Sequence, residues 1–515
     1  MNNIRKLQEI YIMESIVIVI ALLSFLLFLL VFLKSQRISK SGNGYSRIPG
    51  PKPLPLIGNL HLMLRGAPPH HLFRDLAGKY GPLMRLQLGE IQFLIISSVD
   101  LAKQVVRTHD VNFANRPPGL APETLGYNCT GIGFAPYGEY WRQLRRVCTL
   151  ELLSARRVQS FRPIREEENM NLCEWVASRQ GSAANLSEKL YLTSYDVITR
   201  AAVGARTEKG GMVTAIIEDS TKLVSGFIMA DLYPSIKLLP LITGIQFKIR
   251  RMRRRIDRLL DGIIDQHRAA NANASAGAVD EDLVDVLLKI QQDGTQLNLA
   301  TDNIKAVLLD MFIGGTDTSA MTVEWAMSEM IRNSSILNKA QEEVRKVFDG
   351  KGYVDEDKFG DLKYLKLIIK ETLRLHTPAP LLVPRMNTQT CEIDGYEIPA
   401  GTRVIVNAWA LGRDPKYWND AEKFMPERFE ESSIDFKGNN LEYIPFGAGR
   451  RMCPGMSFGL ANVEFPLAML LYHFNWKLPN GMKEEDLDMT EAFAGVIRRK
   501  HHLHLIPILK RPLHP

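Results

Sequence analysis

The stretch Pro445-Phe-Gly-Ala-Gly-Arg-Arg-Met-Cys-Pro-Gly455 decides the fold of this chain. Its cysteine, Cys453, follows a glycine-rich loop and precedes an apolar helical pattern through Ala461–Tyr472. A thiol at a helix start beside two arginines is expected to have a lowered pKa and to be ready as a ligand. Glycines let the backbone approach a flat cofactor closely. The alternative, an inert cysteine in a turn, is disfavoured by the residues that accompany it: Phe446, Gly449, Arg451 and Gly455.

Four further motifs stand along the chain: Trp141-Arg-Gln-Leu-Arg145, Gly314-Gly-Thr-Asp-Thr-Ser319, Glu371-Thr-Leu-Arg374 and Phe424-Met-Pro-Glu-Arg-Phe429. Each alone is weak, since a pair such as Glu371 and Arg374 is often only a surface pair on one helix face. Five motifs in this order resemble the cytochrome P-450 superfamily, from Ile48 to the C-terminus. The resemblance implies a mainly α fold with small β-sheets, in a single large globular domain that binds haem b.

The resemblance also implies roles for single residues. Cys453 would be the axial ligand of the haem iron, with Phe446 beside it. Charge-assisted bonds to the haem propionates are expected from Trp141, Arg145, Arg385 and Arg451. A buried structural cluster behind the cysteine loop is expected from Glu371, Arg374 and Arg428. Thr318 and Asp317 would be catalytic, organising the protons that O–O cleavage needs.

Residues Thr301–Arg332 predict one long helix, although Gly314 and Gly315 lie near its middle. Each glycine costs roughly 1 kcal/mol relative to alanine inside a helix. Thr318 follows Gly314 by four residues and projects from the same face. The glycines indicate a close approach to the helix backbone or an opening of the helix, and the resemblance implies that this groove admits dioxygen. The alternative is ordinary helix packing, with the threonine hydroxyl bonded back to the preceding turn.

The N-terminal part predicts a membrane anchor. Ser15–Leu33 is uncharged and would rise roughly 28 Å as a helix, about the thickness of a bilayer core. Its length favours an uncleaved anchor over a signal peptide. More positive charges follow the span than precede it, which predicts a single-pass protein of the endoplasmic reticulum membrane with its body in the cytosol. The predicted parts are a short lead (1–14), the anchor (15–33), a basic and proline-rich hinge (34–59) and the monooxygenase domain (60–515).

Composition excludes several other classes. Apolar residues make up 45% of the 515 residues and charged residues 23%, as in folded globular proteins. The net charge of +7 suits an anionic membrane or an acidic protein partner, and no basic arm for nucleic acid stands out. The five cysteines form no CxxC pair, which argues against a disulfide framework or a zinc site. No phosphate-binding glycine loop is present, so NADPH and flavin are expected to act through a separate NADPH–cytochrome reductase.

The expected substrate pocket is almost wholly apolar, which predicts a hydrophobic substrate. The segments that match the family's pocket supply Leu308, Ile313, Gly314, Ala379, Leu381, Leu382, Val383, Phe493, Ala494, Val496 and Ile497. Phe134-Ala-Pro-Tyr-Gly-Glu-Tyr-Trp-Arg-Gln143 and Pro399-Ala-Gly-Thr-Arg-Val-Ile-Val-Asn-Ala-Trp409 resemble the plant A-type branch that contains premnaspirodiene oxygenase. One departure is Thr377, where this plant group usually has proline, and it leaves the local loop shape open.

That branch implies a reaction in plant specialised metabolism. One oxygen atom of dioxygen would be inserted into a sesqui- or diterpenoid, with an alkaloid or phenylpropanoid as the alternative substrate. Two rival functions stay open. One is a haem-thiolate enzyme that rearranges hydroperoxides without a reductase, and the presence of Thr318 argues against it. The other is a non-catalytic haem-binding membrane protein.

Overall fold

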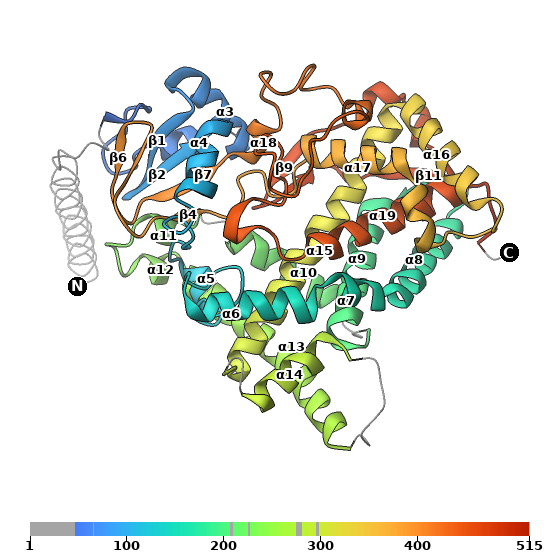
Figure 1. Ribbon diagram of the computed structural model, residues 1–515, viewed down its shortest axis with the longest axis horizontal. Helices are drawn as coiled ribbons and strands as arrows, with labels where there is room; N and C mark the ends of the chain where they lie inside the picture. The colour runs from blue at the N-terminus through green and yellow to red at the C-terminus, as the bar shows by residue number, and fades with distance from the viewer. Residues whose placement is uncertain are drawn as a thin grey trace, which may run out of the picture.

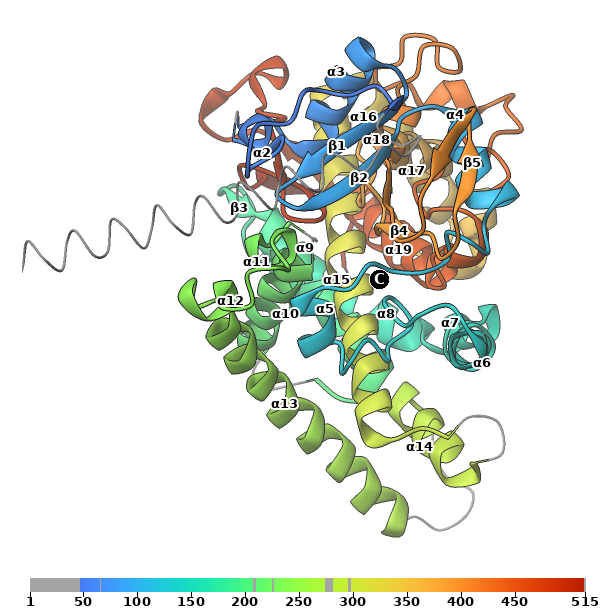
Figure 2. The ribbon, with the colours of Figure 1, turned by 90° about the vertical axis from the view of Figure 1, so that its left-hand side faces the viewer.

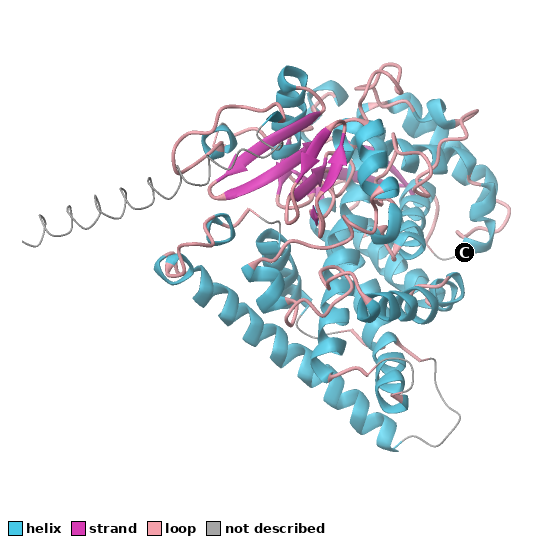
Figure 3. Ribbon diagram, turned by 60° about the vertical axis from the view of Figure 1, so that its left-hand side comes forward, coloured by secondary structure: helices cyan, strands magenta, loops and turns pink. Residues whose placement is uncertain are grey.

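Helices fill most of the described chain (Figure 3), and the strands form separate small sheets, with β1 and β2 at the left of Figure 1 and β11 at its right. The computed structural model describes residues 47–513, apart from 65, 207–209, 225–226, 274–280 and 295–297. The mainly α fold with small sheets is therefore confirmed. The α-helices are α2 (Leu60–Met63), α3 (Pro69–Tyr80), α4 (Val99–Lys103), α5 (Leu120–Leu125), α6 (Glu139–Val147), α7 (Ala155–Ser160), α8 (Arg162–Ala177), α9 (Leu186–Val203), α10 (Gly210–Val224), α11 (Met229–Leu232), α12 (Leu239–Ile242), α13 (Ile245–Asn273), α14 (Leu283–Asp293), α15 (Thr301–Arg332), α16 (Ser334–Phe348), α17 (Lys363–Leu375), α18 (Ala408–Leu411) and α19 (Met456–His473).

The largest described sheet has the strand order β1-β2-β7-β4, in which β2 and β7 run parallel and the other pairs are antiparallel. Val404–Val406 of β7 are buried, as is usual for a strand with a parallel neighbour. Strands β5 and β6 form a separate antiparallel hairpin, whereas β7 joins the larger sheet. The strands are β1 (Leu83–Leu88), β2 (Ile91–Ile96), β3 (Ala184–Asn185), β4 (Arg385–Met386), β5 (Cys391–Ile393), β6 (Tyr396–Ile398), β7 (Arg403–Val406), β8 (Phe474–Lys477), β9 (Glu491–Phe493), β10 (Ile497–Arg499) and β11 (His504–Leu509).

Helix α15 runs through the middle of the molecule and packs against α9, α17 and α19 (Figure 2). Its predicted bounds are confirmed, and the helix is unbroken at its two glycines. A Cβ on Gly315 would lie 2.8 Å from Cδ1 of Ile198, so this glycine allows α9 to pack closely. A Cβ on Gly314 would meet no atom within 4 Å. The two adjacent glycines therefore have different surroundings. Gly315 lies against α9, whereas Gly314 faces an open space.

The described part of the proline-rich hinge belongs to the globular body. The Arg85 amide donates to the Pro49 carbonyl at 2.9 Å, and a Cβ on Gly50 would lie 2.2 Å from the Arg85 carbonyl oxygen. Residues 49 and 50 therefore pack directly against β1. The predicted anchor, residues 15–33, lies outside the described residues. Within the described ranges, no helix has the length and apolar character to cross a membrane.

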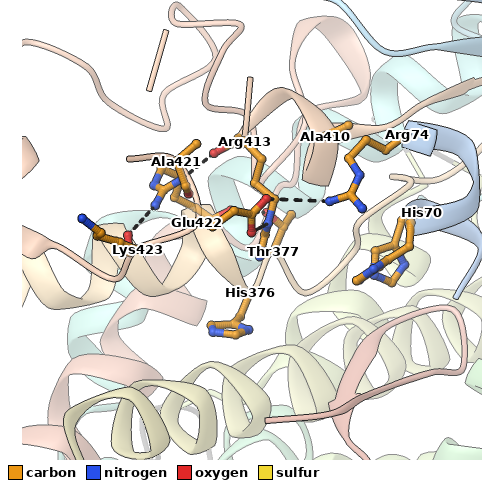
Figure 4. Close-up of polar contacts among 12 residues, drawn as sticks. His70, Arg74, His376, Thr377, Ala410, Arg413, Ala421, Glu422 and Lys423 are labelled. Carbon is orange, nitrogen blue, oxygen red and sulfur yellow. Dashed lines mark hydrogen bonds and ion pairs between the residues drawn. The ribbon is translucent and has the colours of Figure 1, made fainter. Parts of the chain in front are cut away.

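The hydroxyl of Thr377 closes the end of α17. It donates to the carbonyl of Leu373 at 2.8 Å and to that of Arg374 at 3.3 Å, two of the carbonyls that a helix end leaves unpaired. The neighbouring His376 ring stacks on Trp325 with centroids 4.0 Å apart. Figure 4 shows both residues at this turn. A threonine can thus end the helix where proline is usual in the resembling group.

Candidate active site

The Cys453 thiol faces a cavity of about 360 Å³. The loop before it closes on itself, since the Cys453 amide donates to the Phe446 carbonyl at 2.9 Å. Gly449 in this loop has φ of 71°, and a Cβ there would lie 2.4 Å from the Val106 carbonyl oxygen. This position therefore requires glycine. Helix α19 begins at Met456, just after the cysteine, as predicted.

The expectation of a lowered thiol pKa is wrong for the polypeptide by itself. Burial raises the pKa of Cys453, and the opposing effects of the Gly455 amide and the Arg145 charge are smaller. Desolvation outweighs them because the thiol lies deep inside the protein. Coordination to a metal ion deprotonates a thiol outright, so the thiolate would come from the iron rather than from the helix.

Four guanidinium groups line the cavity, those of Arg116, Arg145, Arg385 and Arg451. Burial lowers the pKa of each, that of Arg451 to about 9. Within the described chain, the one carboxylate paired with any of them is Asp110, whose Oδ1 lies 3.0 Å from Nη1 of Arg385. Four cations, of which Arg385 and Arg451 are buried, beside one carboxylate suit a dianionic group. The residues present therefore fit a haem, whose two propionates would balance this charge.

Arg116 was not predicted to line the cavity. Trp141 was expected to bind a haem propionate. The indole N–H of Trp141 donates to the Ile132 carbonyl at 3.0 Å, so here it holds the backbone of a loop. Arg116 donates to the carbonyls of Gly133 at 3.0 Å and Val383 at 2.7 Å. The sequence signal for Arg116 was a basic residue before two prolines with no acidic neighbour.

The cluster implied by the resemblance forms behind the cysteine loop. Glu371 and Arg374 are fully buried, and their side chains are joined by two bonds of 2.7 and 2.8 Å. Arg428 donates to Glu371 at 2.9 Å, and the Met425 amide does so at the same distance. Arg374 also donates to the Gly412 carbonyl at 2.6 Å. The cluster thus ties α17 to the segment that precedes the cysteine loop.

Thr318 and Asp317 point in different directions, because successive helical residues are about 100° apart. Thr318 lines the cavity, and its hydroxyl donates to the Gly314 carbonyl at 2.7 Å. The backward bond that we treated as an alternative is therefore present. Asp317 is not among the lining residues; its Oδ2 lies 2.8 Å from Nη2 of Arg498, which also pairs with Glu218 at 2.9 Å.

The predicted pocket residues divide into two groups. Ile313, Gly314, Ala379, Leu382 and Val383 line the cavity, and Leu382 has φ of 52°, a strained value for leucine. The others do not line it: Leu308, Leu381, Phe493, Ala494, Val496 and Ile497. Leu308 lies in the core between helices, and Val496 and Ile497 pack on Trp325 and Trp409. The sequence missed several apolar lining residues from distant helices and loops: Phe134, Phe161, Ile198, Ala201, Leu283 and Phe458.

A cysteine that faces an apolar cavity lined by guanidinium groups, beside a central helix, is typical of a haem-thiolate protein. The family model for cytochrome P450 matches residues 48–505, and the chain belongs to that family. Its members are monooxygenases that use haem b and take electrons from NADPH through a reductase.

The chain is similar to plant enzymes over nearly its full length. Salviol synthase of Salvia pomifera is 50% identical over 491 residues, covering 95% of this chain and 97% of the relative. Desmethyl-deoxy-podophyllotoxin synthase of Sinopodophyllum hexandrum is 51% identical over 497 residues (95% and 97%), and premnaspirodiene oxygenase of Hyoscyamus muticus is 49% identical over 499 residues (96% and 99%). These relatives place the chain among the plant A-type enzymes, in the terpenoid-oxidising branch. A zebrafish cytochrome P450 structure with progesterone shares the fold, with a TM-score of 0.74 and 24% identity over 86% of this chain and 100% of that one.

Proposed function

We propose that this monooxygenase inserts one oxygen atom into a sesqui- or diterpenoid in plant specialised metabolism. The observation that carries the proposal is the apolar wall of the cavity beside Cys453, which includes Ile313, Ala379 and Leu382. A cavity of this kind recognises substrates by shape and apolar contact. Support also comes from the terpenoid-acting relatives salviol synthase and premnaspirodiene oxygenase.

The residues around the cavity would have separate roles in the reaction. Bound haem supplies the activation of dioxygen, favoured by its thiolate ligand. Cys453 would hold the iron, while Arg145, Arg385 and Arg451 would bind the propionates. The Thr318 hydroxyl can rotate from the Gly314 carbonyl toward the cavity and carry a proton at Oγ1. Asp317 would exchange protons with this path only when its ion pair with Arg498 opens.

The protein would work at the cytosolic face of the endoplasmic reticulum membrane, held by residues 15–33. Electrons would arrive from a membrane-bound NADPH–cytochrome reductase. Arg450, in the cysteine loop, is half-exposed and suits an acidic docking surface on that partner.

The test is turnover by microsomes that contain the full chain and a reductase, supplied with sesquiterpene and diterpene hydrocarbons. NADPH-dependent formation of an oxygenated terpene is the expected result. A panel of alkaloids and phenylpropanoids runs in parallel, and exclusive turnover of either class would replace the terpenoid assignment. Product formation from hydroperoxides without NADPH would instead support a rearranging enzyme.

The role of Thr318 is tested in the same system. Thr318→Ala should keep NADPH oxidation but lower the fraction that yields product, by about tenfold or more if proton delivery is lost. Ser328→Ala is the matched control, because Ser328 makes the same backward bond on α15, at 2.7 Å to Glu324, and does not line the cavity. Full coupling in the Thr318 variant would refute this role.

A further inference from the structure

Asp310 is the one carboxylate among the residues that line the cavity in the described chain. It lies on α15 four residues before Gly314 and eight before Thr318, and these spacings place all three on one helix face. An acidic group in an apolar cavity could bind a cationic substrate, or it could have a structural role through bonds to the protein backbone. Its contacts decide between these two roles.

Asp310 is bonded to the backbone of the loop that joins α5 to α6. Its Oδ2 accepts the Gly133 amide at 2.9 Å. A Cβ on Gly131 would lie 2.2 Å from the same oxygen and 3.1 Å from the Ala306 carbonyl oxygen. The loop thus approaches the carboxyl so closely that position 131 has room only for glycine.

The backbone carbonyls of this loop accept hydrogen bonds from residues on the opposite side, among the guanidinium groups of the cavity. Arg116 donates to the Gly133 carbonyl at 3.0 Å, and Trp141 donates to the Ile132 carbonyl at 3.0 Å. Arg451 also donates to Ile132, at 3.3 Å, and to Ala135. Loop 131–135 is therefore fixed between α15 and the residues expected around the haem, and Ile132, Gly133 and Phe134 of this loop line the cavity.

We propose that Asp310 is a positioning residue that fastens loop 131–135 to α15 and thereby sets one wall of the cavity. The geometry assigns it no role as an anchor for a cationic substrate, because its carboxyl is turned to the loop and is bonded by the Gly133 and Ile132 amides. The substrate class that follows is neutral and apolar. This last step rests on the proposed function, since it takes the cavity as the substrate site.

The bond to the loop needs an acceptor oxygen at position 310 and does not require a negative charge. Burial raises its pKa to about 6, against the lowering effect of the Gly133 and Ile132 amides. The titratable groups that sense it, Cys129, Tyr140 and Cys148, have raised pKa values and are neutral at physiological pH. An amide oxygen can accept the same Gly133 N–H. Asparagine should therefore replace aspartate here, whereas alanine should not.

The test measures azole binding to the haem-loaded full chain from the shift of its Soret band, without any substrate. Phenylimidazole fills the space beside the iron, whereas imidazole is too small to need the loop wall. Asp310→Ala should raise the Kd of phenylimidazole about tenfold, as expected for the loss of one hydrogen bond. The Kd of imidazole should change by less than about twofold, as should both constants in the exposed control Asp302→Ala. Because no turnover is needed, a wrong substrate class leaves this result unchanged.

Three further variants exclude a general loss of structure. Asp310→Asn should retain phenylimidazole binding to within about threefold, since one bond remains. Gly131→Ala should weaken binding as Asp310→Ala does, and the double variant should be no weaker than either single one, because removing the carboxyl makes room for the methyl group. Equal weakening of both azoles, unchanged binding in Asp310→Ala, or additive effects in the double variant would each overturn the proposal.

Discussion

Replacing Glu371 by glutamine should lower the melting temperature of the protein measurably. The side chain is fully buried and accepts hydrogen bonds from Arg374, Arg428 and the Met425 amide. Glutamine keeps the shape but leaves two guanidinium groups without their counter-charge. Breaking a buried pair in this way costs about 3–5 kcal/mol. The entropy of unfolding of a 515-residue chain is about 1 kcal/mol per kelvin, so Tm should fall by about 3–5 °C.

The assay is the melting temperature of the haem-loaded protein, together with the haem content of the purified chain from its reduced, carbon-monoxide-bound spectrum. Glu427→Gln is the matched control in the same segment. Glu427 is 40% exposed and pairs with Lys339 at 3.0 Å, and exposed pairs contribute at most about 1 kcal/mol. Equal shifts of Tm in the two variants would refute the argument that burial decides the effect.

Three other perturbations have defined outcomes. Cys453→Ala should lose the thiolate-type Soret band of the carbon monoxide complex. Thr377→Val should lower the free energy of unfolding by about 1–2 kcal/mol, measured by denaturant titration, because two carbonyls at the end of α17 lose their donor. The hydrogen bond with Asp282, 2.7 Å long, raises the pKa of His267 from 6.5 to about 9. Since the folded-state pKa is raised, its stabilisation is present below pH 6.5 and lost as the pH rises to about 9. Relative to His267→Gln, the native protein should therefore lose about 1–2 kcal/mol over that range, a figure reduced for solvent screening.

Each of these outcomes has a contrary result. A thiolate-type band in the Cys453 variant would place the iron ligand elsewhere. Unchanged stability in the Thr377 variant would mean that water replaces the hydroxyl at the helix end. Parallel stability curves for native protein and His267 variant would show that the Asp282 pair adds nothing to folding.

The features predicted well from the sequence are local in the chain. The glycine-rich loop, the cysteine before a helix and the length of α15 depend on neighbours a few residues apart. The spacing of Glu371 and Arg374 already placed them on one helix face. The different directions of Asp317 and Thr318 also follow from helix geometry, so the sequence alone could have predicted that only one of them lines the cavity.

The remaining features depend on contacts between distant segments. Nothing in the sequence joins Asp310 to Gly133, or Arg116 to Val383, until the chain is folded. Apolar composition is the same for a residue in the core as for one that lines a cavity, so Leu308 and Val496 were misplaced while Phe458 was missed. The pKa of Cys453 depends on the depth of burial, which a helix start and two arginines do not reveal.

Haem should be a folding partner of this chain as well as its reactive group. The four guanidinium groups that line the cavity repel one another in the bare polypeptide, and a bound dianion would relieve that repulsion. A ligand that binds only the native state adds its binding free energy to stability. The yield of folded protein in a cell should then rise with the supply of haem during synthesis. The stability of the folded chain should therefore depend on the amount of haem that is bound.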